Sequence, residues 1–234
     1  LFAAMMLKTE DADAVLGGLT TYYADTVRPA LQVLPLEHGR TIVSALYIVV
    51  VEGRPYFFAD CAVNIRPTAA ELAEIALSAA AAALHDFDVS PRVAMISYSN
   101  FGSAGGEEPD RVREAVRICN EKAPDLPLDG EMHAETAIRP TLLEKRHPFN
   151  RLGGPANVLV FPDLAAANAS YQLMHRLAGA QVIGPILTGT SKSVHVAQRD
   201  AAVGDIVNLT AIAVLDAQRK SRNSTLAAEI ERSF

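Results

Sequence analysis

Residues 157–163, with the sequence Asn-Val-Leu-Val-Phe-Pro-Asp, predict a short buried strand that runs directly into a helix. Asp163 stands where a helix-capping side chain is needed, and the helix is expected to continue through His175 and to stop at Gly179. Residues 181–187 predict a second strand. A strand, a helix and a strand in this order are typical of an α/β fold with a mostly parallel sheet.

The same alternation runs along the rest of the chain. Thr68 and Glu71 have the spacing of a capping box, so a long Ala-rich helix is expected to begin there. Pro29 is expected in the first turn of its helix, where a missing N–H does least harm. Residues 52–55, Glu-Gly-Arg-Pro, predict a hairpin turn. Further strands are expected at 12–18, 41–51, 56–61, 92–99 and 128–132, and further helices at 26–34, 68–84, 110–121 and 205–218.

Composition excludes several classes of protein. Half of the 234 residues are hydrophobic and 21% are charged, which is globular rather than disordered. The formal net charge of −6 argues against a nucleic-acid-binding surface, which needs clustered Lys and Arg. No apolar run approaches the roughly 20 residues of a membrane helix. Cys61 and Cys119 form no CxxC motif, which favours a reducing, cytoplasmic setting.

Three polar, glycine-containing stretches follow predicted strands, where α/β folds bind ligands. They are residues 97–103, residues 129–135, and residues 184–189, which lead into Lys192, His195 and Arg199. Residues 97–103 offer hydroxyls and a flexible backbone suited to cradling an anion or a phosphate, and residues 129–135 concentrate three carboxylates with a histidine. Each of the three stretches can instead serve only as a strand-to-helix turn whose Ser and Asp cap helices.

The sequence lacks GxGxxG, GxxxxGK[ST], HExxH and GxSxG, and its six histidines lack metal-ligand spacing. His133 with Asp129, Glu131 and Glu135 could bind a metal, but solvated loop charges explain this cluster better, so no metal site is expected.

Taken together, several stretches resemble the phosphate acetyltransferase and phosphate butyryltransferase family. In chain order they are Asp25-Thr-Val-Arg-Pro-Ala-Leu-Gln32, Phe58-Ala-Asp-Cys61, Pro91-Arg-Val-Ala-Met-Ile-Ser-Tyr-Ser99, Asp129-Gly-Glu131, Asn157-Val-Leu-Val-Phe-Pro-Asp163, Gly184-Pro-Ile186 and Asp205-Ile-Val-Asn208. Within the family, residues 99–103 and 129–133 look most like the C-terminal phosphotransacetylase-like domain of bacterial NADP-dependent hybrid malic enzymes. The abrupt apolar start at Leu1 fits a malic-enzyme part, and the first part of the acyltransferase-like domain, lying upstream.

The resemblance implies a two-lobed α/β fold, like that of isocitrate and isopropylmalate dehydrogenases, with a ligand cleft between the lobes. Residues 38–186 would form the second lobe. Residues 1–37 and 187–234 would be the remainder of the first lobe, whose N-terminal part would be missing. The family also implies self-association as a dimer or a higher homo-oligomer, with no nucleic-acid or membrane partner.

The resemblance also implies roles for individual residues. Asp205 matches the carboxylate proposed as base for the coenzyme A thiol, and Arg199 matches the arginine before it. Gln198 replaces the serine of the family's usual Ser-Arg-Gly-Cys, which here is Gln198-Arg-Asp-Ala201. The catalytic candidates are therefore Asp205, Arg199 and Gln198, and the ligand-binding candidates are Arg28, Ser97, Ser99, Ser103, Gly130, Glu131, Lys192 and Arg199.

The replacement at Gln198 favours a regulatory function. In this interpretation the chain is part of an NADP-dependent malic enzyme, which decarboxylates malate oxidatively to pyruvate, and it binds acetyl-CoA as an effector with little acyl transfer. This domain would hold no cofactor besides acetyl-CoA or CoA as ligand, and NADP and a divalent metal would belong to the missing domain. One alternative is an active phosphate acetyltransferase that acts on an acyl phosphate and CoA. The other is a purely structural oligomerisation domain.

Overall fold

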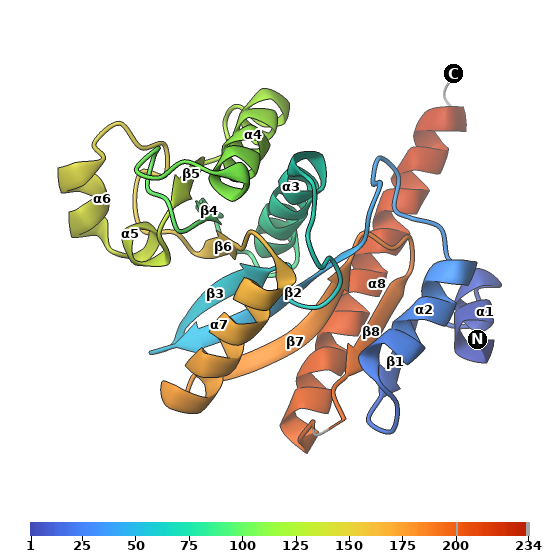
Figure 1. Ribbon diagram of the computed structural model, residues 1–234. Helices are drawn as coiled ribbons and strands as arrows, with labels where there is room; N and C mark the ends of the chain where they lie inside the picture. Colours follow the sequence, from blue (N-terminus) through green and yellow to red (C-terminus); the bar gives the residue numbers. More distant parts are fainter. Residues whose placement is uncertain (200, 233–234) are drawn as a thin grey trace. The chain divides into compact units, whose positions relative to one another are not determined.

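Figure 1 shows the computed structural model, which describes residues 1–199 and 201–232. The chain forms two compact units. The first unit consists of residues 1–43 and 183–234, and the second unit consists of residues 44–182. Strand β7 (Gln181–Thr188) leads the chain from the second unit back into the first.

The second unit is built on a mixed sheet in which five strands follow the order β5-β4-β6-β3-β2. Strands β3 and β6, β6 and β4, and β4 and β5 pair in parallel, whereas β2 and β3 pair antiparallel. The strands are β2 (Ser44–Val51), β3 (Arg54–Ala59), β4 (Val93–Ile96), β5 (Leu128–Met132) and β6 (Val158–Val160). The alternation of strands and helices predicted from the sequence is confirmed.

The antiparallel pair comes from the predicted hairpin. Its two turn residues, Glu52 and Gly53, both have positive φ, at 50° and 76°. This combination defines the type I′ turn, whose twist matches that of the two flanking strands. Because the hairpin introduces an antiparallel pair into a parallel sheet, the sheet is mixed. The expected isocitrate/isopropylmalate dehydrogenase-like fold is wrong, as the solved relatives described below also show.

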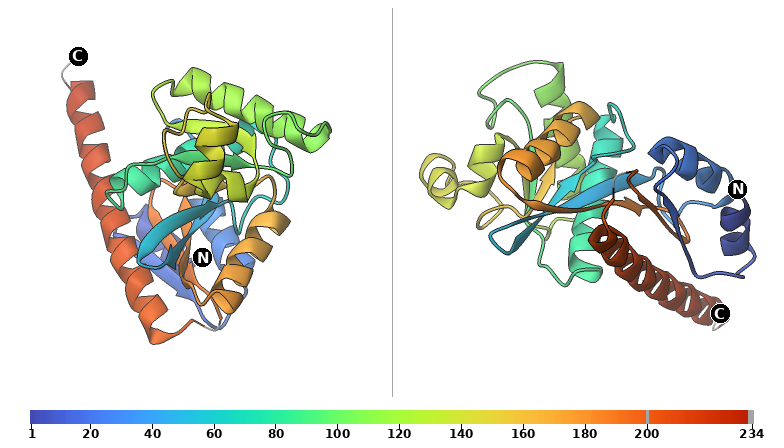
Figure 2. Two further views of the ribbon diagram at one scale, coloured as in Figure 1. Left: turned by 90° about the vertical axis from the view of Figure 1, so that its left-hand side faces the viewer. Right: turned by 90° about the horizontal axis from the view of Figure 1, so that it is seen from below.

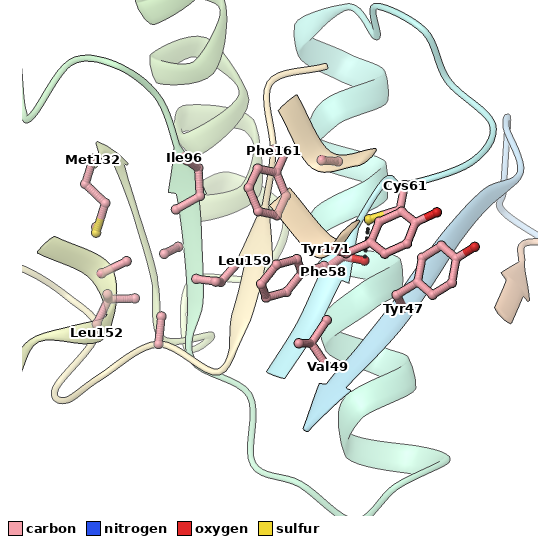
Figure 3. Close-up of a cluster of buried hydrophobic side chains, with 14 of the residues drawn as sticks. Tyr47, Val49, Phe58, Cys61, Ile96, Met132, Leu152, Leu159, Phe161 and Tyr171 are labelled. Atoms are coloured by element: carbon pink, nitrogen blue, oxygen red, sulfur yellow. Dashed lines mark hydrogen bonds between the residues drawn. The ribbon is translucent and has the colours of Figure 1, made fainter. Parts of the chain in front are cut away.

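One face of this sheet carries a core of aromatic rings, shown in Figure 3. Tyr47 of β2 stacks on Tyr171 of α7 with ring centroids 4.2 Å apart, and Phe58 lies 5.1 Å from Phe161. Neighbouring residues in β2 and β3 point to opposite faces, so Phe57 instead meets Phe87, which follows α3. The helices of this unit are α3 (Ala69–His85), α4 (Glu107–Lys122), α5 (Ala134–Ile138), α6 (Pro140–Arg146) and α7 (Leu164–Leu177).

Two predicted helix starts are confirmed. Thr68 accepts a hydrogen bond from the N–H of Glu71, whose side chain accepts one from the N–H of Thr68, so α3 begins with a complete capping box. Asp163 accepts a hydrogen bond from the N–H of Ala166 at 2.8 Å and caps α7. Cys119 is buried on the predicted inner face of α4.

The first unit holds a two-stranded parallel sheet, β1 with β8, and the long helix α8 that lies beside β8 (Figures 1 and 2). Gly18 at the end of β1 allows this strand to lie close to β8, because a Cβ at Gly18 would come within 2.1 Å of the carbonyl oxygen of Ala197. The elements of this unit are α1 (Phe2–Lys8), β1 (Ala14–Gly18), α2 (Tyr23–Val33), β8 (Ser193–Ala197) and α8 (Val203–Arg232).

Three details of the first unit differ from the sequence-based expectations. Helix α2 starts at Tyr23, so Pro29 lies inside the helix rather than in its first turn. Strand β8 was not predicted, because five residues following a loop show too short a pattern. Helix α8 continues beyond Gln218, where the apolar periodicity ends. None of the helices in the described part of the chain combines the length and hydropathy that a membrane span requires.

Candidate functional site

In the second unit, a buried carboxylate organises the serine-rich loop after β4. Glu131 at the end of β5 is 0% exposed. Its Oε1 lies 2.6 Å from the Ser99 hydroxyl and accepts hydrogen bonds from the N–H of Gly102 at 2.8 Å and from Arg113 at 3.0 Å. The main-chain oxygen of Glu131 also accepts a hydrogen bond from Phe101. Glu131 therefore joins three parts of the loop over residues 97–104, at Ser99, Phe101 and Gly102.

The electrostatics of this group favour an ionised carboxylate. Burial alone would raise the pKa of Glu131, but the hydrogen bonds from Ser99 and Gly102 and the charge of Arg113 together lower that pKa below its ordinary value. Oε2 of Glu131 is buried and has no hydrogen-bond partner in the described part of the chain. Three donors on one oxygen therefore stabilise the negative charge.

Gly130 allows Glu131 to reach this position. A Cβ at Gly130 would come within 2.7 Å of the carbonyl oxygen of Met95 in the neighbouring strand β4. The backbone φ of Gly130 is also +153°. Gly130 thus permits close packing of β5 against β4 at the end where the loops emerge, and no ligand is needed to explain it.

The other predicted residues of the second unit differ in accessibility. Ser97 and Ser99 are buried, and Ser103 is exposed with its hydroxyl accepting from the N–H of Asn100. His133 lies 2.7 Å from the carbonyl oxygen of Tyr98, so it ties β5 to the same loop. Among the described residues, no group of three His, Cys, Asp or Glu side chains is arranged to hold a metal ion.

In the first unit, the structure brings Arg199 to the start of α2. Its guanidinium lies over the Tyr22 ring, 4.9 Å from the centroid, in a cation–π contact. Tyr22 immediately precedes α2, and Arg28 lies on that helix, exposed and without an ion pair to any described residue. Two arginines distant in sequence therefore lie at one short helix, Arg199 at its start and Arg28 within it.

Asp205 lies in the first turn of α8. Its Oδ2 accepts a hydrogen bond from the N–H of Ala202 at 2.9 Å, which is the acidic half of a capping box. Its Oδ1 has no hydrogen-bond partner among the described residues. Gln198 and Arg199 directly follow β8, so the three catalytic candidates lie between the end of β8 and the first turn of α8.

The Lys192 ammonium group, a predicted ligand-binding group, already has a partner within the chain. This group pairs with the carboxylate of Glu10 at 2.9 Å, and the main-chain oxygen of Lys192 accepts a hydrogen bond from Lys220. His195, in the middle of β8, is 0% exposed. Whether the predicted side chains bind a ligand together is not tested by these contacts, and their assignment as a site stays a prediction.

An apolar hollow of about 370 Å³ opens beside α7 in the second unit. Val49, Phe58, Leu159 and Met174 are among the side chains that line it. The lining includes no charged group, so this hollow offers no base for a thiol and no cation for a phosphate.

Sequence reasoning missed two residues that the structure places at these sites. Arg113 pairs with Glu131, yet in the sequence it is one of many charged residues on a helix whose outer face is polar. Tyr22 supports Arg199, but the two residues are 177 positions apart, so no local pattern joins them. The aromatic ring next to a predicted helix start was the only available signal.

Comparison with known proteins agrees with the sequence resemblance at the family level. The profile described as "Phosphate acetyl/butaryl transferase" matches residues 1–214. The phosphate acetyltransferase of Bacillus subtilis (strain 168) is 41% identical over 92% of this chain and 67% of its own length. That of Nitratidesulfovibrio vulgaris is 42% identical over 93% of this chain but only 31% of its own length.

Solved structures show the same relationship. A phosphotransacetylase from Streptococcus pyogenes matches with a TM-score of 0.88 and 40% identity, covering 93% of this chain and 67% of its own. The EutD phosphotransacetylase from Staphylococcus aureus matches with a TM-score of 0.85 and 37% identity, covering 92% of this chain and 66% of its own. The fold is therefore that of phosphotransacetylases, which replaces the dehydrogenase-like expectation.

The same matches correct the functional hypothesis. A regulatory domain of an NADP-dependent malic enzyme was expected, and this interpretation is wrong, because these relatives are phosphate acetyltransferases and none is an oxidoreductase. The loss of one hydroxyl at Gln198 does not outweigh the presence of Arg28, Arg199 and Asp205.

Proposed function

We propose that this chain, which belongs to the phosphate acetyl/butaryl transferase family, takes part in transfer of an acetyl group between phosphate and coenzyme A. The observation that carries the proposal is the 41% identity, over 92% of the chain, to a phosphate acetyltransferase. The chain spans about two thirds of the length of that relative. Acyl phosphate and CoA are therefore the proposed partners, and self-association stays a prediction.

Asp205 is assigned the first step. Its Oδ1, which has no hydrogen-bond partner among the described residues, accepts the proton of the CoA thiol, and the resulting thiolate is the nucleophile. The sulfur forms a bond to the carbonyl carbon of acetyl phosphate. The bond between that carbon and the bridging oxygen then breaks, and inorganic phosphate leaves with the electron pair. The proton remains on Asp205 until the reverse reaction or solvent removes it.

Arg28 and Arg199 supply positive charge for this reaction. A guanidinium can hold a phosphate group with two parallel hydrogen bonds, and it also stabilises the oxyanion that develops during attack. The Tyr22 ring restrains Arg199, so less conformational freedom remains to be lost when substrate binds. Gln198 offers both a donor and an acceptor at the position where the resemblance implies a serine, so a polar contact to the thiol is retained.

The experiment is an assay of thioester formation from acetyl phosphate and CoA. The wild-type protein should turn over on the order of 1–10³ per second, the usual enzymatic range. Asp205→Asn removes the base but keeps the shape of the side chain, and it should lower kcat by about 10²- to 10⁴-fold.

Asp163→Asn is the matched control. Asp163 is also an aspartate at a helix start, and asparagine caps a helix about as well, so both folding and activity should be unchanged. Absence of thioester formation by the wild-type protein would refute the proposed function. Full activity in Asp205→Asn would instead show that another group accepts the proton.

A further inference from the structure

A cluster of charged side chains is buried where α8 lies against β8. Asp216 and Lys220 lie one turn apart on α8, and are only 6% and 8% exposed. Their carboxylate and ammonium groups are 2.8 Å apart. Arg219 contacts the other oxygen of Asp216 at 2.9 Å and Glu37 at 3.2 Å. Two carboxylates and two cations thus balance one another inside the first unit.

The cluster also contacts β8 and the turn before it. Lys220 donates a hydrogen bond to the main-chain oxygen of Lys192 at 3.2 Å. His195 of β8 is completely buried, and its Nε2 lies 3.5 Å from Oδ2 of Asp216. Nearby, the Ser193 hydroxyl donates to the main-chain oxygen of Ala213. Polar contacts at these successive points therefore fix how far along β8 the helix lies.

Burying these charges is expensive, and apolar side chains could join a helix to a strand at lower cost. An ion pair fixes the register of α8 on β8, because its charges are paired in only one placement of the helix on the strand. Burial alone would raise the pKa of Asp216, but His195 and Lys220 hold it well below its ordinary value, so this carboxylate is ionised. Burial lowers the pKa of Lys220, and Asp216 opposes that shift. Slippage or rotation of α8 would leave a buried charge unpaired.

The placement of α8 on β8 also positions the candidate catalytic residues, because short stretches of chain join these residues to the two elements. Arg199 follows β8 by two residues, and Asp205 lies in the first turn of α8. Asp216 comes eleven residues after Asp205, close to three full turns, so both lie on the same side of the helix, roughly 16 Å apart. A straight helix held at Asp216 therefore sets both the height and the rotation of the Asp205 carboxylate.

We propose that Asp216 and Lys220 are positioning residues for acyl transfer, which act by fixing α8 on β8 and thereby holding Asp205 and Arg199 in their working arrangement. The inference rests on the proposed function for the identity of the reaction. Neither residue touches substrate in this proposal. Their contribution is the placement of two groups that do.

Three variants separate positioning from general stability. Asp216→Asn and Lys220→Met each leave an uncompensated buried charge, whereas the double variant Asp216→Asn/Lys220→Met restores the charge balance, with Arg219 and Glu37 still paired. Leu72→Ala, which removes a fully buried side chain from α3 in the second unit, is the control for destabilisation alone. The measurements are urea unfolding, kcat and KM for both substrates, and hydrogen exchange at the amides of residues 201–206.

We expect the variants to affect the free energy of unfolding and kcat differently. Both single variants should lose stability and lower kcat by about 10- to 100-fold, because small misplacements of reacting groups are costly. KM should rise by a much smaller factor than kcat falls, because Arg28, which also supplies charge for a phosphate, lies on α2 and is not held by the pair. The double variant should recover most of the lost stability but not the lost kcat. Exchange at residues 201–206 should rise in all three variants, and should not rise in Leu72→Ala.

Recovery of kcat together with stability in the double variant would overturn the proposal, because the pair would then be merely structural. So would unchanged kcat in either single variant. A wild-type protein that forms no thioester refutes the proposed function instead. In that case the exchange data still decide the positioning inference, which is wrong if residues 201–206 exchange no faster in Asp216→Asn than in the control.

Discussion

Glu131 shows how one atom can organise a loop. Three donors converge on its Oε1, while Oε2 is buried without a hydrogen-bond partner in the described part of the chain. Glu131→Gln keeps the shape and removes the charge, so it weakens the contacts with Ser99 and Arg113. Hydrogen bonds to charged groups contribute about 1.5–3 kcal/mol, and the free energy of unfolding should fall by that amount at neutral pH. Urea unfolding measures this change.

The same substitution predicts a pH dependence with a definite sign. The pKa of Glu131 is lower in the folded protein than its ordinary value, so its contribution to stability is complete above the ordinary value. That contribution is lost as the pH falls through the folded-state pKa. The difference in unfolding free energy between wild type and Glu131→Gln should therefore shrink on acidification. The control, Glu135→Gln, removes an exposed partner of Arg139 and should change stability by less than about 0.5 kcal/mol at any of these pH values. A difference that persists in acid would mean that shape, not charge, explains the effect.

At the scale of the residue, the sequence does not predict which side chains contact one another. The resemblance implies that Glu131 binds a ligand, which stays a prediction, and the structure shows that its side chain contacts Ser99, Gly102 and Arg113. The partner Arg113 lies 18 positions away on a different element. Pairings of this kind depend on how a helix packs against a strand end, and a single sequence contains no record of that packing.

Secondary structure was predicted well where a local physical signal marked an element's end. The capping box at Thr68 and Glu71, the cap at Asp163 and the hairpin turn after Val51 are all present. Strand β8 and the short helices α5 and α6 were not predicted, because five to seven residues are too few to show a period. These short elements are fixed by burial against their neighbours, which is a tertiary effect.

The start of α3 gives a test at the scale of the element. Thr68→Ala removes the oxygen that accepts the N–H of Glu71, so one amide at the helix start loses its partner. The free energy of unfolding should fall by about 1 kcal/mol. Thr141, also an exposed threonine near a helix start in the second unit, is the control, and Thr141→Ala should change it by less than about 0.5 kcal/mol. Equal effects in the two variants, measured by urea unfolding, would show that the capping box contributes nothing.

At the scale of the whole molecule, charge limits how CoA can bind. The chain has a formal net charge of −6, and CoA is itself polyanionic, so the overall field opposes binding and local cations must supply the attraction. Arg28 is exposed, forms no ion pair with the described residues and lies on the helix whose start carries the Tyr22–Arg199 contact, so it is the cation that we propose meets a phosphate. Arg176, exposed on α7, has the same charge in a different place.

Arg28→Ala and Arg176→Ala therefore make the same change in net charge but are expected to differ in effect. Losing one charge-assisted contact of about 1.5–3 kcal/mol should raise the Kd for CoA about 10- to 150-fold in Arg28→Ala. Loss of Arg176 alters only the overall field, which salt screens within about 10 Å, so its Kd should stay within about twofold of wild type. Because a ligand raises the melting temperature according to its concentration relative to Kd, CoA should stabilise Arg176→Ala as it does wild type, and Arg28→Ala much less. Calorimetric titration gives Kd directly. Equal weakening in both variants would mean that CoA responds to the overall field, and that the cation meeting its phosphates lies elsewhere than on α2.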